Sequence, residues 1–241
     1  MKYIYKKSIG KTVLFLHGWG GDKNSFSSLY NFLYSYGFSV LSVDFSGFGE
    51  NEPLSREYTI YDYSNDLKNL LKELNITDFY VVCHSFGSRV FAIIDQNFNI
   101  EKSVICDGAG LKEKFSLSKS FKIFKYKFIK KMVNFFKLDK SILNKYGSSD
   151  YKNLPENMKK TFINIVNKDL TNYFKTIKGD VLIYWGKNDD ITPLYMAKKL
   201  KKLIKNSNLI IENGGHFCYL ENDFSFCNLV LEFFKGDLCT F

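Results

Sequence analysis

The sequence predicts an α/β fold, built as a doubly wound and mostly parallel sheet with an inserted helical cap. Short runs of β-branched and aromatic residues alternate with segments of helical periodicity along most of the chain. This alternation is typical of parallel strands whose crossover helices cover both faces of a sheet. It is interrupted once, over the 68 residues from 111 to 178, where helical periodicity continues without a strand. We therefore expect a core of residues 1–110 and 179–241, and a cap or lid of residues 111–178.

Each predicted element follows from its local pattern. Short apolar runs rich in β-branched and aromatic residues are predicted as strands at 11–17, 38–44, 78–83, 102–106, 181–185 and 208–212. Segments with apolar residues three and four apart are predicted as crossover helices at 25–36, 61–74, 86–96, 194–204 and 224–234. The same spacing predicts two cap helices, one at 116–137 and one from Pro155 to about Asn167.

Composition fits a globular protein with a sizeable core. The chain has 241 residues, of which 45% are hydrophobic and only three are proline, so it resembles neither a disordered nor a collagen-like chain. The N-terminus lacks the apolar run of a signal peptide, and no segment approaches the roughly 20 apolar residues of a membrane span. We therefore expect a cytoplasmic protein without a transmembrane segment. The five cysteines lack Cys-x-x-Cys spacing, so we expect neither a disulfide framework nor a metal site.

A serine stands where the third predicted strand meets a predicted helix. The segment reads Tyr80-Val81-Val82-Cys83-His84-Ser85-Phe86-Gly87. A strand that turns directly into a helix is the setting of a nucleophile elbow, in which residues two positions from the serine must be small. Gly87 meets this requirement, whereas Cys83 stands where the usual Gly-x-Ser-x-Gly pattern has its first glycine. The motif predicts Ser85 as a nucleophile, and a serine that only caps the helix is the alternative.

The loop after the first long predicted strand reads Phe15-Leu16-His17-Gly18-Trp19-Gly20-Gly21. Together with the serine turn, it resembles the His-Gly-Trp-Gly loop of α/β-hydrolases. The resemblance implies that the backbone N–H groups of Trp19 and Phe86 form an oxyanion hole. Fixed donors of this kind stabilise a developing oxyanion by about 3–4 kcal/mol each. An ordinary strand-to-loop turn is the alternative. The supporting loop residues would be His17, Gly18, Gly20 and Gly87.

The acid is expected in a loop that also resembles the family. Residues 186–193 are similar to its Gly-x-x-Asp-x-x-x-Pro loop, and the spacing from both ends selects Asp189. Its role would be to accept a hydrogen bond from the Nδ1–H of the base. Asp190 and Asp107 remain alternatives, the latter because some family members carry the acid at the end of the strand before the cap.

The base is expected to be His216, in the loop after the last predicted strand. Of the three histidines, His17 belongs to the oxyanion loop, and His84 is expected to point away from the nucleophile. The Gly-Gly-His segment around His216 resembles the Gly-His loop of the family. Ser85, Asp189 and His216 also occur in the chain order that this fold prescribes.

The resemblance implies a serine hydrolase that cleaves a carboxylic ester or thioester through an acyl-enzyme, without a cofactor. A serine at position 85 argues against the aspartate-dependent dehalogenases and epoxide hydrolases of this fold. Two alternatives stay open: a non-catalytic binding protein of the same fold, and a hydrolase that acts on C–C bonds or lipids.

Positive charge is concentrated in the predicted cap. Residues 111–178 hold 17 of the 34 basic residues and five of the 25 acidic ones, a net charge of +12 against −3 elsewhere. A surface of one sign beside a site attracts oppositely charged partners. We expect a small-molecule or carrier-linked acyl substrate, and an acyl carrier protein, an anionic lipid surface or a small anionic ester as the acidic partner. Nucleic acid is not expected, because arginine is scarce and no recognition motif occurs.

Overall fold

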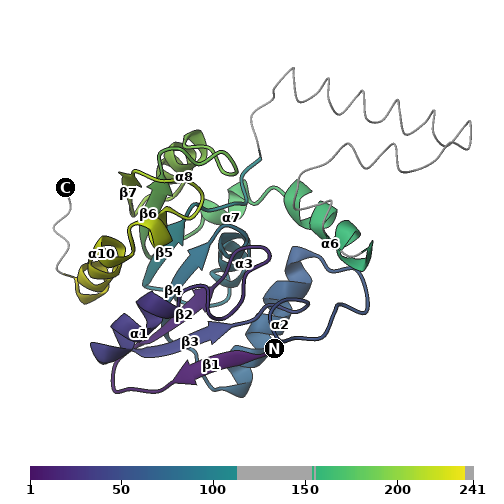
Figure 1. Ribbon diagram of the computed structural model, residues 1–241, viewed down its shortest axis with the longest axis horizontal. Helices are drawn as coiled ribbons and strands as arrows, with labels where there is room; N and C mark the ends of the chain where they lie inside the picture. The colour runs from purple at the N-terminus through teal and green to yellow at the C-terminus, as the bar shows by residue number, and fades with distance from the viewer. Residues whose placement is uncertain (113–153, 155, 237–241) are drawn as a thin grey trace, which may run out of the picture.

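The computed structural model describes residues 1–112, 154 and 156–236. Within these residues a seven-stranded sheet forms the centre of the molecule (Figure 1). The strands are β1 (Tyr3–Lys6), β2 (Thr12–Leu16), β3 (Ser39–Val43), β4 (Phe79–His84), β5 (Lys102–Cys106), β6 (Asp180–Gly186) and β7 (Ser207–Glu212). Their order is β1-β3-β2-β4-β5-β6-β7, and neighbours are parallel except for β1, which pairs antiparallel with β3.

Helices cover both faces of this sheet (Figure 1). One face packs against α1 (Ser27–Ser35), α9 (Cys218–Glu221) and α10 (Asp223–Lys235). The other packs against α2 (Ile60–Glu73), α3 (Phe86–Ile94), α6 (Glu156–Asn167), α7 (Thr171–Phe174) and α8 (Tyr195–Leu203). Successive strand residues alternate between the two apolar clusters, as Leu14 and Phe15 do in β2, because side chains of a strand point to opposite faces.

The predicted fold class is confirmed, with six predicted strands found as β2 to β7 and five predicted crossover helices as α1, α2, α3, α8 and α10. The sequence did not predict β1, because lysines surround its two tyrosines, and pairing with β3 is what makes it a strand. The short helices α7 and α9 were not predicted either. No helix of the described residues is long and apolar enough to span a membrane.

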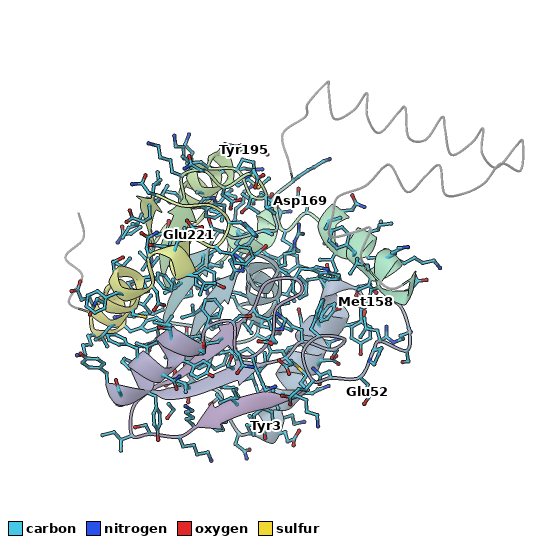
Figure 2. The ribbon with its side chains drawn as sticks, viewed as in Figure 1. Tyr3, Glu52, Met158, Asp169, Tyr195 and Glu221 are labelled. Atoms are coloured by element: carbon cyan, nitrogen blue, oxygen red, sulfur yellow. The ribbon has the colours of Figure 1, made fainter. Side chains whose placement is uncertain are left out.

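The second predicted cap helix is confirmed as α6, whose Met158, labelled in Figure 2, is nearly buried in the core cluster. The first, at 116–137, lies outside the described residues. The division into core and cap therefore stays a prediction.

The carboxyl ends of the parallel strands lie side by side, which brings distant loops together. In the register of the sheet, Leu16 of β2 is opposite Cys83 of β4. Farther along, His84 of β4 is opposite Cys106 of β5, which is in turn opposite Tyr184 of β6. Ligands of such sheets bind at this edge.

Candidate active site

Ser85 occupies a strained turn between β4 and α3. Its φ of 46° and ψ of −109° lie where a residue with a side chain is uncommon, at a cost on the order of 1–3 kcal/mol. Hydrogen bonds hold this conformation: the Ser85 N–H donates to the carbonyl of Cys106 at 3.1 Å, and the Ser85 carbonyl accepts from the Ser88 hydroxyl at 2.6 Å. The turn is therefore tied to the neighbouring strand β5 and to the first turn of its own helix.

Small residues let the backbone segments approach around this turn. A Cβ atom at Gly87 would lie 2.1 Å from the carbonyl oxygen of Leu16, and one at Gly18 would lie 2.5 Å from Nδ1 of His84. Neither position accepts a side chain without displacing a strand end or a buried ring. Cys83 is fully buried, so its small side chain is accommodated where the family pattern usually has glycine.

His216 bridges Ser85 and Asp189. Its Nε2 lies 3.0 Å from the Ser85 Oγ, and its Nδ1 lies 2.9 Å from the Asp189 Oδ2. Because a carboxylate accepts at Nδ1, the imidazole carries its proton there and turns the Nε2 lone pair toward the serine hydroxyl. The structure thus brings together three side chains that stand 131 and 27 residues apart in the sequence.

The carboxylate of Asp189 is held in its ionised form. Burial alone would raise the pKa of Asp189, but hydrogen bonds from His216 and Thr192 and the nearby His216 charge outweigh it and lower that pKa. The backbone N–H groups of Ile191 and Thr192 donate to Oδ1 at 2.8 and 2.9 Å. An ionised Asp189 is the form that stabilises an imidazolium beside it.

Thr192 is a site residue that the sequence reasoning missed. Its hydroxyl donates to Asp189 Oδ2 at 2.6 Å, and its carbonyl accepts from the indole N–H of Trp185 at 2.8 Å. Its position beside Pro193, in the loop that suggested Asp189, was the available signal.

The two alternative acids do not contact His216 through any hydrogen bond within the described residues. Asp107 accepts from the Gly186 N–H at 2.8 Å and from the Cys218 thiol at 3.1 Å. Burial is the main cause that raises the pKa of Asp107 to about 8, and the negative charge of Asp189 adds to it. Asp190 is exposed. The geometry therefore favours Asp189 as the partner of His216.

The other two histidines are buried and neutral. Burial lowers the pKa of His17 to about 4 and that of His84 to about 3. His17 Nδ1 donates to the Gly18 carbonyl at 2.7 Å, and its Nε2 accepts from the Phe45 N–H at 3.0 Å. His84, which was expected to point away from the nucleophile, donates from its Nε2 to the His216 carbonyl at 2.8 Å, and its ring forms no hydrogen bond with Ser85 in the described residues. Each ring ties one loop of the site to another.

The two residues that carry the predicted oxyanion donors, Trp19 and Phe86, meet in an aromatic cluster. The ring of Trp19 meets the rings of Phe48, Phe86 and Phe162 at centroid distances of 4.8, 5.3 and 5.2 Å. Gly20, with a φ of 80°, turns the loop that carries Trp19. In the described part of the chain, the backbone N–H groups of Trp19 and Phe86 have no protein acceptor. Both donors are therefore available to a ligand.

Comparison with known proteins identifies the family. The sequence matches the α/β hydrolase fold family over residues 11–128 and 127–223. The chain belongs to this family. An AB hydrolase superfamily protein of Bacillus subtilis is 24% identical to it, over 93% of this chain and 91% of its own length. The pimeloyl-[acyl-carrier protein] methyl ester esterase of Wigglesworthia glossinidia brevipalpis is 27% identical, over 98% of this chain and 99% of its own.

Solved structures of other α/β-hydrolases share the fold. An esterase from Exiguobacterium antarcticum superposes with a TM-score of 0.74 at 20% identity, covering 97% of this chain and 95% of its own. A meta-cleavage product hydrolase from Pseudomonas fluorescens superposes with a TM-score of 0.72 at 18% identity, covering 98% of this chain and 94% of its own. The described residues of this α/β-hydrolase contain no group of His, Cys, Asp and Glu side chains that could hold a metal ion.

The raised pKa of Asp107 predicts a pH-dependent stability. The pKa of an aspartate carboxyl in an unfolded chain is about 4, whereas the pKa of Asp107 in the folded protein is about 8. Between these values the unfolded chain ionises and the fold does not, so this group lowers the free energy of unfolding as pH rises. Asp107→Asn cannot ionise and should remove that slope. Thermal unfolding from about pH 5 to about pH 8 should show the variant gaining stability relative to wild type.

The same substitution at exposed Asp190 is the control and should leave the pH dependence unchanged. A difference between wild type and Asp107→Asn that stays constant with pH would mean that Asp107 is ionised in the fold.

Proposed function

We propose that the chain is a serine hydrolase of carboxylic esters or thioesters, in which Ser85 is the nucleophile, His216 the general base and Asp189 the orienting acid. The observation that carries this proposal is the hydrogen-bonded path from Ser85 Oγ through His216 to the Asp189 carboxylate, at 3.0 and 2.9 Å. The esterases among the relatives support an ester as the bond cleaved.

The proposed reaction has two steps. In the first, Ser85 Oγ attacks the acyl carbonyl carbon while His216 Nε2 takes its proton, and the carbonyl π electrons move to the oxygen. Collapse of this tetrahedral intermediate expels the alcohol or thiol, which receives the proton from His216. In the second, water gives a proton to His216 as its oxygen attacks the acyl carbonyl carbon. Collapse of this second tetrahedral intermediate breaks the bond between Ser85 Oγ and the acyl carbon, His216 returns the proton to Oγ, and a carboxylic acid leaves. The backbone N–H groups of Trp19 and Phe86 would stabilise both oxyanions.

The substrate proposal combines the relatives with the charge pattern. One relative is named as an esterase of a pimeloyl group on an acyl-carrier protein. For this chain we propose an acyl substrate that is a small molecule or is linked to a carrier, attracted by the lysine-rich segment of residues 111–178. The net charge of +12 on that segment supports an acidic partner.

The nucleophile is tested by Ser85→Ala, which should lower kcat by more than about a thousandfold, because the attacking oxygen is lost. A fluorophosphonate probe should label the wild type and not this variant. Ser225→Ala, an exposed serine on α10, is the matched control and should be labelled normally. An unlabelled wild type would favour the non-catalytic binding protein, and a labelled protein without ester hydrolysis would favour another bond such as C–C.

The acid is tested by comparing three aspartates. Asp189→Asn should lower kcat by about 10³- to 10⁴-fold, because an amide in that place permits the wrong tautomer of His216. Asp107→Asn and Asp190→Asn should keep kcat within about tenfold of wild type, since neither side chain forms a hydrogen bond with His216 in the described residues. Steady-state kinetics on one ester substrate decides among them. A larger loss for Asp107→Asn than for Asp189→Asn would assign the acid to the other strand end.

The charge proposal is tested by salt. If the lysine-rich segment attracts an acidic substrate, kcat/KM for that substrate should fall as salt rises while kcat changes little, because screening acts on encounter. Lys122→Glu, Lys127→Glu and Lys130→Glu, in the predicted first cap helix, should reproduce the loss at low salt. Reversal of the exposed core lysines Lys72, Lys202 and Lys205 is the matched control. Equal responses of neutral and anionic esters would refute the attraction.

A further inference from the structure

A buried arginine of the nucleophile helix holds the end of α6. Arg89 lies on α3, four positions after Ser85, and is only 7% exposed. Its guanidinium donates to the carbonyls of Ile165 and Lys168, both at 2.9 Å, and to that of Val166 at 3.5 Å. The carbonyls of Ile165 and Val166 belong to the last turn of α6, and that of Lys168 follows the helix directly; a helix leaves its last carbonyls without partners.

The charge of Arg89 is satisfied mainly by carbonyls at this helix end, and the nearby negative charge of Asp169 also favours the cation. Burial lowers the pKa of Arg89 to about 10, so the group stays cationic at neutral pH. Within the described residues it forms no ion pair with a carboxylate, and a buried cation without compensating hydrogen bonds is costly. The partial negative charge of a helix C-terminus and several carbonyl acceptors supply that compensation. A planar fork of donors reaches three carbonyls from one side chain more readily than a lysine ammonium does.

Through α6, this contact reaches the oxyanion loop. Phe162, on the middle of α6, packs edge-on against Trp19 at 5.2 Å. The indole N–H of Trp19 is buried and has no hydrogen-bond partner in the part of the chain that the structure describes. Among the described residues, the position of this ring is therefore set by packing. Two of its aromatic neighbours, Phe48 and Phe86, belong to the core, and Phe162 is the one that α6 supplies.

We propose that Arg89 is a positioning residue for the oxyanion hole, an inference that rests on the proposed hydrolase function. By fixing the end of α6 on the nucleophile helix, Arg89 keeps Phe162 against Trp19 and so holds the Trp19 backbone N–H where the oxyanion forms. Such donors act mainly on the transition state. Loosening this contact therefore lowers kcat and leaves KM nearly unchanged.

The first test measures the position of Trp19 directly. The chain has two tryptophans, so a Trp185→Phe background leaves Trp19 as the sole indole fluorophore. In that background, Arg89→Met should shift the emission to longer wavelength and increase quenching by acrylamide, and Arg89→Lys should fall between. Lys102→Met is the matched control, because Lys102 Nζ donates to the carbonyls of Phe233 and Phe234 at the end of α10 in the same manner. It should leave the Trp19 emission unchanged.

The second test is a kinetic double-mutant cycle with native Trp185. Arg89→Met should lower kcat for an ester by about tenfold with KM within about threefold, and Phe162→Ala should do the same. Because both act through one contact, the double variant should be little worse than either single variant. Circular dichroism establishes whether each variant is folded. If Arg89→Met does not fold, the cycle is made with Arg89→Lys and Phe162→Ala instead.

The outcomes distinguish a failure of the positioning role of Arg89 from a failure of the proposed hydrolase function. Unchanged Trp19 emission in folded Arg89 variants, additive losses in the cycle, or a rise in KM with constant kcat would overturn the positioning role. A wild-type protein without hydrolase activity would refute the proposed function instead, while a shifted Trp19 emission in Arg89→Met would still establish the structural link.

Discussion

The strained turn at Ser85 is the constraint on which the site depends. The strand before it, β4, is central in the sheet, between β2 and β5, so its terminal turn touches loops from both neighbours. Gly87 must lie against the Leu16 carbonyl and Gly18 against His84. The Ser85 N–H donates to the carbonyl of Cys106 in β5. A strained serine is stable only where the surroundings fix it from several sides. The same close contacts bring the loop of Trp19 and the turn of Ser85 together.

Burial of neutral polar groups leaves the site with one dominant charge. His17 and His84 are too deeply buried to be protonated at neutral pH, so each acts as a hydrogen-bond donor to a backbone carbonyl. Burial likewise keeps Asp107 protonated up to about pH 8. Asp189 remains as the ionised carboxylate beside His216. Its hydrogen bond to Nδ1 of His216 orients the imidazole so that Nε2 lies 3.0 Å from the Ser85 Oγ.

Sequence patterns predicted β2 to β7 because these strands are short runs rich in β-branched and aromatic residues, and the resemblance of three strand-end loops to those of α/β-hydrolases selected Ser85, Asp189 and His216. Sequence-based prediction failed for the features that tertiary contacts determine. β1 has no apolar run of its own. The bond from His84 to the His216 carbonyl spans 132 residues, and that from Arg89 to the Ile165 carbonyl spans 76. Both partners are backbone carbonyls, which every residue possesses, so no side-chain pattern marks them.

Hydrogen bonds fix α6 to the core, so within the predicted cap this helix has a packing role that differs from the proposed attraction of a charged partner. Besides the Arg89 contact, the Thr161 hydroxyl accepts from the Tyr58 N–H at 2.9 Å, and the Leu170 N–H donates to the Gly110 carbonyl at 2.8 Å. Bonds at its middle, at its end and just beyond fix this helix to the core. Side chains on α6 that contact the site are therefore held in fixed positions, as core side chains are. Attraction of a charged partner requires no such precision, because it depends on net charge over a surface and not on one geometry. Packing by α6 and long-range attraction by lysines can thus coexist in one segment without competing for the same residues.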